Sequence, residues 1–174
     1  MAVDHREPAI VIFKHLIRIV RDQADHGRSG VVFENIKITF GDIAPIVNEQ
    51  VTGTKYTPLN LRYPLGLVKW AIYCLNQSRG REPIPQINYL VVNSGTRFAP
   101  RGAHNSDIDT PQLKQQRIWA WIFGFEWSDD ISREVIGQIR SGPILLSKEH
   151  GSILHAAGDP QPASSEAISK GARR

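Results

Sequence analysis

Apolar residues recur at helical spacing near the start of the chain. The residues that form this face are Ile10, Phe13, Leu16, Ile17 and Val20. Pro8 suits a first helical turn, so the pattern predicts an amphipathic helix from Glu7 to Asp25, which ends at the glycine- and serine-containing break 26–30. The opposite side of this helix carries Lys14, Arg18 and Arg21.

The pattern then changes to short β-branched stretches and two further helices. Residues 31–33 and 36–40 favour extended structure. A second helix is expected to begin near Thr39 or Gly41, and Pro45 suits only its first turn, so this helix is short or begins late. After a loop at 52–58, a third helix is predicted over 59–77. Its expected buried face is Leu61, Leu65, Val68, Ile72 and Leu75.

The densest apolar run outside the helices is Ile87–Asn93, which predicts a strand covered on both faces. A turn at 93–96 and a basic loop at 97–102 follow. Gln112–Phe125 is predicted to be a helix on the core, and a capping pattern at 128–130 precedes a last helix, Ile131–Ile139. Residues 1–142 are therefore expected to form one globular domain. Residues 143–174 are expected to form a C-terminal extension that is flexible over 158–174.

Composition narrows the class of protein. Of the 174 residues, 41% are hydrophobic and 22% are charged, as in globular proteins. The single cysteine, Cys74, excludes an internal disulfide and a multi-cysteine zinc site, and its apolar neighbours suggest a core position. No apolar run reaches the roughly 18–20 residues of a membrane span, and no secretory signal pattern is recognisable at the start. We therefore expect a cytosolic protein without a membrane partner.

The order of elements and the charge together favour nucleic-acid binding. The net charge of +4 permits contacts to phosphate. Two helices, a strand and a basic wing, in that order, predict an α+β fold with a winged-helix-like core over 36–102, a small sheet and additional packing helices. Helix 59–77 would enter a groove and wing 97–101 would flank the duplex. The residues expected at the interface are Phe40, Lys55, Asn60, Arg62, Lys69, Asn93, Ser94, Arg97 and Arg101.

Several of these residues have a second interpretation. Asparagine and arginine can make bidentate contacts to adenine and guanine, but they are equally common as solvated surface residues. Phe40 could stack on a base, although an aromatic residue beside Ile38 and Ile43 also suits the core. The spacing alone does not decide between these interpretations.

Three segments resemble a domain of bacterial HNH endonucleases. They are ITFGDIA at 38–44, RYPLG at 62–66 and PIPQINYLVVNSGT at 83–96, followed by the tryptophan-rich stretch 119–127. In those enzymes the similar domain precedes the nuclease domain, and in other proteins it stands alone. The resemblance spans about 36–127. It implies a DNA-recognising domain, and no nuclease domain accompanies it in this sequence.

The same region is more distantly similar to the DNA-binding domain of alkylguanine alkyltransferases and alkyltransferase-like proteins. In those proteins a tyrosine assists base flipping, an arginine intercalates and a cysteine accepts the alkyl group. Here Phe40 stands at the tyrosine, the arginine position falls near Leu59 or Asn60, and Asn88–Leu90 replaces the Pro-Cys-His sequence. Alkyl transfer is therefore excluded, because no thiolate nucleophile is available at that position.

Two alternatives to non-catalytic DNA binding stay open. His104, Asp107 and Asp109 could hold a divalent ion for a metal-dependent nuclease, although the same loop would also cap a helix. No second histidine at HNH spacing and no phosphate-binding loop is recognisable, so neither a metal nor a cofactor is expected. Alternatively, the chain could be a protein-binding adaptor, or an anti-defence or toxin-linked protein that acts by occlusion. Trp119–Trp127 and the C-terminal extension would then contact a protein partner.

Overall fold

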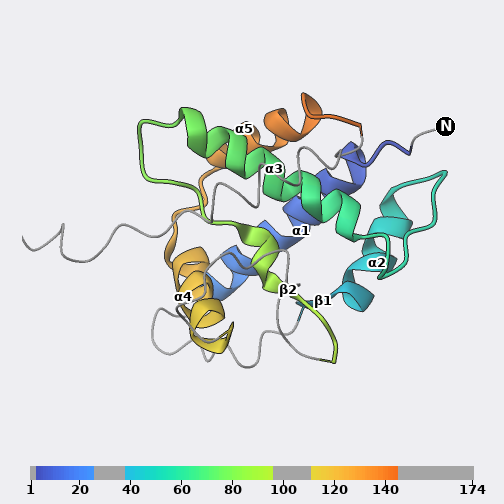
Figure 1. Cartoon of the computed structure of the whole chain (residues 1–174), viewed down its shortest axis with the longest axis horizontal. Coiled ribbons are helices and arrows are strands. Elements are labelled where there is room, and N and C mark those ends of the chain that lie inside the picture. Colours follow the sequence, from blue (N-terminus) through green and yellow to red (C-terminus); the bar gives the residue numbers. More distant parts are fainter. Residues whose placement is uncertain (1–2, 26–37, 96–110, 145–174) are drawn as a thin grey trace, which may run out of the picture.

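The computed structural model describes residues 3–25, 38–95 and 111–144, which combine helices with a small sheet (Figure 1). The helices are α1 (Arg6–Asp25), α2 (Phe40–Gln50), α3 (Arg62–Ser78), α4 (Pro111–Gly124), α5 (Asp129–Arg140) and the short 3-10 helix η2 (Ile87–Leu90). The strands are β1 (Ile38–Thr39) and β2 (Val91–Val92). The expected mixture of α and β structure is thus confirmed at this level.

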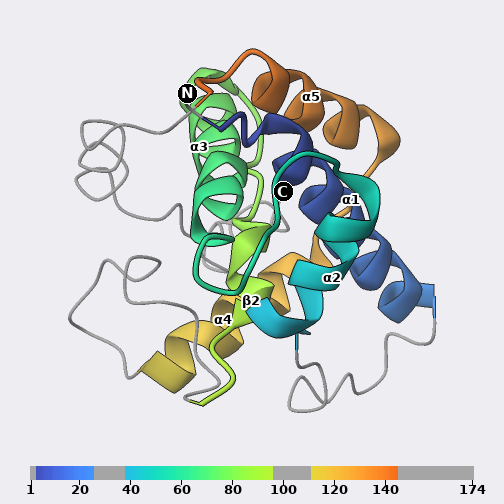
Figure 2. The same cartoon turned by 90° about the vertical axis from the view of Figure 1, so that its right-hand side faces the viewer.

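Helix α1 is the centre of the packing. It contacts α2, α3, α4, α5 and η2. Ile12, Phe13 and Leu16 are fully buried, as expected for the apolar face of an amphipathic helix. In Figure 1, α1 crosses behind α3, while α5 lies alongside α3, and Figure 2 gives the perpendicular view of the same arrangement. The predicted helix 7–25 is confirmed within one residue.

Helix α2 begins at a capping box and continues through a proline. The Thr39 hydroxyl accepts a hydrogen bond from the Asp42 amide at 3.2 Å, and the Asp42 carboxylate accepts one from the Thr39 amide at 2.8 Å. The expectation that Pro45 would lie in the first turn of a short or late helix is wrong, because the helix runs to Gln50. Pro45 is exposed and removes one intrahelical hydrogen bond, while burial of Ile43 and Val47 holds the helix together.

Helix α3 begins three residues later than predicted. Residues 58–61 form a turn in which the Leu61 amide donates to the Thr57 carbonyl at 3.2 Å. Pro64 then occupies the third helical position, where a backbone N–H has no partner within the helix. The buried face is also wider than the expected stripe, since Leu67 and Ala71 are fully buried.

Most of the predicted strand 87–93 is not a strand. Residues 87–90 form η2, and only Val91 and Val92 pair with β1, in parallel and opposite Ile38 and Thr39. Tyr89 and Leu90 are both fully buried, so the apolar density reflects complete burial and not a pleated surface. The indole N–H of Trp119 donates to the Tyr89 carbonyl at 2.9 Å, which occupies a group that a strand would use for pairing.

The last two helices form as predicted. The Ser128 side chain caps α5 by accepting a hydrogen bond from the Ile131 amide at 3.2 Å. Trp119 and Trp127 are both only 6% exposed, which favours the core interpretation of this stretch over an exposed contact patch. No helix in the described ranges is long and apolar enough to cross a bilayer.

Two asparagines fix the chain after α2 and near the end of α3 in the same way. The Asn48 amide donates to the Tyr56 carbonyl at 2.8 Å and accepts from the Tyr56 amide at 2.6 Å. Asn76 makes the equivalent pair with Ile84, at 2.9 Å and 2.8 Å. Each side chain therefore satisfies both backbone groups of a residue eight positions later, which ties an irregular segment to a helix.

Candidate nucleic-acid interface

The turn between α2 and α3 is an exposed segment with a well-braced backbone. Besides the Asn48 clamp on Tyr56, the Asn60 side-chain oxygen accepts from the Thr57 amide at 2.7 Å. The Asn60 side-chain nitrogen donates to the Lys55 carbonyl at 3.3 Å. Backbone groups of Lys55, Tyr56 and Thr57, which an irregular segment could leave unpaired, thus have hydrogen-bond partners. The backbone of this turn is therefore held in place beneath its exposed side chains.

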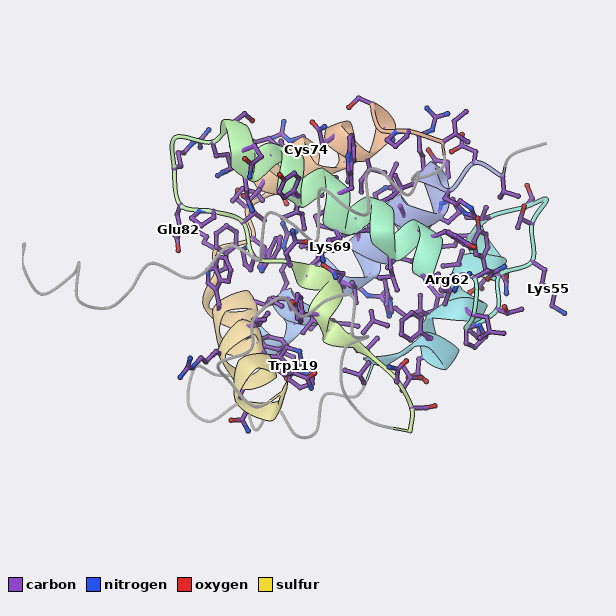
Figure 3. All side chains as sticks on the ribbon, in the orientation of Figure 1. Lys55, Arg62, Lys69, Cys74, Glu82 and Trp119 are labelled. Carbon is purple, nitrogen blue, oxygen red and sulfur yellow. The ribbon has the colours of Figure 1, made fainter. Side chains whose placement is uncertain are left out.

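An apolar side chain flanked by cations projects from this turn. Leu59 is 84% exposed, and Lys55 and Arg62, which precede and follow it in the sequence, are also exposed. Figure 3 shows Lys55 and Arg62 on the same side of the molecule, with Lys55 extending outward and Arg62 at the start of α3. We call the exposed residues Lys55, Pro58, Leu59, Arg62 and Tyr63 the α2–α3 tip.

Arg62 is held by aromatic neighbours. Its guanidinium carbon lies 4.9 Å from the centre of the Tyr63 ring, and its Nη2 donates to the Tyr63 hydroxyl at 2.9 Å. The Tyr63 ring is stacked on His5, with 5.3 Å between ring centres and an interplanar angle of 18°. His5 Nδ1 lies 2.9 Å from the hydroxyl of Tyr56, which the Asn48 clamp fixes. These contacts form a line, Arg62–Tyr63–His5–Tyr56, that connects an exposed cation to the buried core.

The buried members of this line are uncharged at neutral pH. Burial lowers the pKa of His5, and the nearby Asp4 carboxylate opposes that shift only in part. Burial also raises the pKa of the Tyr56 hydroxyl, and the Asp4 charge adds to that shift. The only fixed charge in the line is therefore on Arg62, at its exposed end.

The lowered pKa of His5 predicts that acid weakens the fold. Burial also lowers the pKa of His15 on α1, with Arg18 contributing in the same direction. Between the folded and unfolded pKa values the unfolded chain binds more protons, so stability is complete above about pH 6.5 and declines as the pH falls below it. Denaturant unfolding between about pH 5.5 and 7.5 should show this decline. A His5→Gln, His15→Gln variant should show a shallower decline, and equal slopes would contradict the assignment.

The structure brings together only some of the predicted interface residues. Lys55 and Arg62 are both exposed and belong to the α2–α3 tip, and their contact with DNA stays a prediction. Asn60 lies next to them, but both polar groups of its side chain brace the turn, so it is not available to read a base edge. Lys69 is a correction, because it is buried at 9% exposure and does not lie with the exposed cations of the tip.

The other predicted residues divide into two groups. Phe40 is half-buried against the core, which favours its structural interpretation, while Asn93 and Ser94 are exposed directly after β2. Arg97 and Arg101 of the predicted wing fall outside the described residues. The same is true of His104, Asp107 and Asp109 of the alternative metal site, and of the C-terminal extension.

Three residues at or next to the α2–α3 tip are not predicted from sequence to bind. Leu59 stands where the alkyltransferase resemblance lacks its intercalating arginine, and the sequence signal that marks it is an apolar residue beside Pro58 in a polar loop. Tyr63 stands out in the sequence only as part of the RYPLG motif. His5 carries no local signal, because its contacts are with residues more than fifty positions away.

The remaining chemistry of the described ranges is limited. Cys74 is half-buried in α3, and burial raises the pKa of its thiol, which disfavours the thiolate that a nucleophile needs. Among the residues that the structure describes, no three His, Cys, Asp or Glu side chains group as a metal site. No known protein family, curated protein or solved structure matches this chain.

Proposed function

We propose that this chain is a non-catalytic protein that binds duplex DNA through the α2–α3 tip, as a winged-helix-like module. The observation that carries the proposal is the exposed Leu59 between two exposed cations on a braced turn. Lys55 and Arg62 suit phosphate oxygens, and an apolar side chain between them suits a sugar face or a base step. A surface of this kind offers cations to the charged phosphates of a nucleic acid and an apolar side chain to its sugars and bases.

The start of α3 adds an electrostatic argument. No side chain caps this helix at Leu61, and its first turn carries no acidic residue. The positive end of the helix dipole is therefore not neutralised by a carboxylate of its own first turn, which favours a nearby anion. The contribution is electrostatic, because the Tyr63 amide already donates to the Asn60 carbonyl at 3.2 Å and Pro64 has no N–H. At α2, by contrast, the carboxylate of Asp42 already occupies the equivalent place.

Other features support the same function more generally. An α2–turn–α3 arrangement next to a small sheet is compatible with a helix-turn-helix, in which the start of the second helix approaches the bases. The wing predicted at 97–101, which lies outside the described residues, would supply Arg97 and Arg101 from a second segment. The resemblance of 36–127 to a domain that precedes HNH nucleases supports recognition without cleavage. Burial of Trp119 and Trp127 leaves less support for a tryptophan-based protein contact.

A titration of the full chain tests this proposal. Fluorescence anisotropy with a labelled duplex of about 30 base pairs should show binding at about 50 mM salt that weakens steeply by about 200 mM, without cleavage when Mg²⁺ or Mn²⁺ is added. Absence of binding to duplex, single strand and RNA at low salt would overturn the proposal. Tighter binding to RNA than to duplex DNA would contradict duplex DNA as the target and would indicate RNA instead. Cleavage abolished by His104→Ala would establish the nuclease alternative, and a stoichiometric protein partner without DNA binding would favour the adaptor.

A further inference from the structure

The N-terminal segment before α1 contacts the side chains of the α2–α3 tip. His5 is only 6% exposed, and it is the one residue of this segment that touches both Tyr56 and Tyr63 among the described ring contacts. Its ring stacks on Tyr63 and lies edge-on to Tyr56, with 5.9 Å between the ring centres in the second pair. The Tyr63 ring is in turn the surface against which Arg62 lies.

This arrangement restricts a side chain that would otherwise be mobile. An exposed arginine samples many rotamers, and a cation that is already oriented loses less freedom when it contacts a phosphate. Tyr63 is partly exposed at 37%, so Arg62 alone would not fix its ring. His5 fixes the Tyr63 ring from its buried side, because the His5 ring stacks on it and Nδ1 of His5 is held 2.9 Å from the hydroxyl of the buried Tyr56.

We propose that His5 is a positioning residue of the binding surface, which fixes the Tyr63 ring and through it the Arg62 guanidinium. This inference rests on the proposed function and adds the N-terminal segment to the recognition surface. Histidine suits the role since a flat ring can stack on Tyr63 while a ring nitrogen satisfies the buried Tyr56 hydroxyl.

The charges around His5 leave Arg62 available. The Asp4 carboxylate is engaged by Arg6, with Nη2 at 2.6 Å and Nε at 3.0 Å from its oxygens. The Arg6 contact and the nearby His5 lower the pKa of Asp4, so Asp4 is ionised but already paired. Within the described part of the chain, the polar partner of Arg62 is the neutral Tyr63 hydroxyl, so the guanidinium keeps its charge for a phosphate.

A double-mutant cycle on the full chain tests this role. His5→Ala should lower the slope of log affinity against log salt by about 0.9, the loss of one phosphate contact, and weaken duplex binding several-fold. The double variant with Arg62→Ala should bind no worse than Arg62→Ala alone, since both remove the same contact. His5→Phe keeps a ring that can stack on Tyr63 but loses the contact of Nδ1 with the Tyr56 hydroxyl, so its salt slope should fall between those of the wild type and His5→Ala. His15→Ala is the matched control, because it removes a half-buried histidine of α1 and should leave the slope unchanged.

Several outcomes would overturn the inference. An unchanged salt slope in His5→Ala, or losses that add fully in the double variant, would make His5 a structural residue only. If His5→Ala fails to fold, Tyr63→Leu removes the same ring contact from the exposed side and should reproduce the loss of slope. A wild-type chain that binds no duplex at low salt would instead refute the proposed function, so the two failures are distinguishable.

Discussion

Replacing Lys55 and Arg62 together with alanine is expected to weaken duplex binding by at least an order of magnitude at low salt and to flatten its salt dependence. Each cation that neutralises a phosphate releases counterions, so the slope of log affinity against log salt should fall by about 0.9 for each residue. Both side chains are exposed, and so their loss should leave the melting temperature close to that of the wild type. Anisotropy titrations at four or five salt concentrations measure the slope directly.

The matched control removes the same charge from another element. Lys14→Ala with Arg18→Ala takes two exposed cations from α1 and changes the net charge equally. If binding depends on the α2–α3 tip, this pair should alter the slope far less than the pair at the tip. Equal losses from both pairs would show that affinity follows net charge alone, and the tip would lose its special role.

Gly142→Ala is expected to destabilise the fold by about 1–3 kcal/mol. Gly142 is buried beyond the end of α5, and a Cβ there would lie 2.7 Å from Cζ3 of Trp70 on α3 and 3.1 Å from the Ile139 carbonyl oxygen. Trp70 is partly buried against the core and the Ile139 carbonyl is backbone, so the added Cβ must be accommodated by a shift of the indole or of the end of α5, where α3 and α5 pack together. Equilibrium denaturation in urea gives the free energy of unfolding.

Gly137→Ala, in α5 itself, is expected to change the free energy of unfolding in the opposite direction. Apart from its chain neighbours and the backbone of its own helix, no described atom lies within 4 Å of a Cβ at Gly137, which is exposed inside α5. Alanine there should stabilise the chain by about 0.5–1 kcal/mol, because it reduces the backbone freedom of the unfolded state. A neutral Gly142→Ala beside a stabilising Gly137→Ala would mean that Trp70 relocates without cost.

Helices α1 and α5 were predictable because local spacing and caps indicate them, whereas the proline in α2 and the missing side-chain cap of α3 left the extent of those two helices uncertain from sequence. The apolar face of α1 and the Ser128 cap of α5 are properties of neighbouring residues, and both predictions hold. Residues 87–90 failed for a physical reason. A short run that is buried on all sides has the same composition whether it is a strand or a 3-10 helix, and tertiary contacts such as the Trp119 hydrogen bond decide between them.

The candidate site was predictable only as far as its exposed charges. Lys55 lies in the loop that the composition of 52–58 predicts, and Arg62 lies near the predicted start of the third helix. Lys69 lies four residues after Leu65 and three before Ile72, so it falls beside the apolar face of α3, and its burial depends on tertiary packing that the sequence of α3 alone does not reveal. The contacts of His5 depend on the path of the whole chain from α1 to α3, so a local pattern could not have revealed them.

The parallel pairing of β1 with β2 also has a consequence for the order of assembly. The two strands are separated in the chain by the whole of α2 and α3, so their register closes a long loop and forms few hydrogen bonds in return. Contacts of that kind cost chain entropy early and become favourable only when the intervening helices are already in place. The small sheet should therefore be completed late in folding, after α2 and α3 have met α1. Amide exchange at Val91 and Val92 would then report whether the two helices have docked.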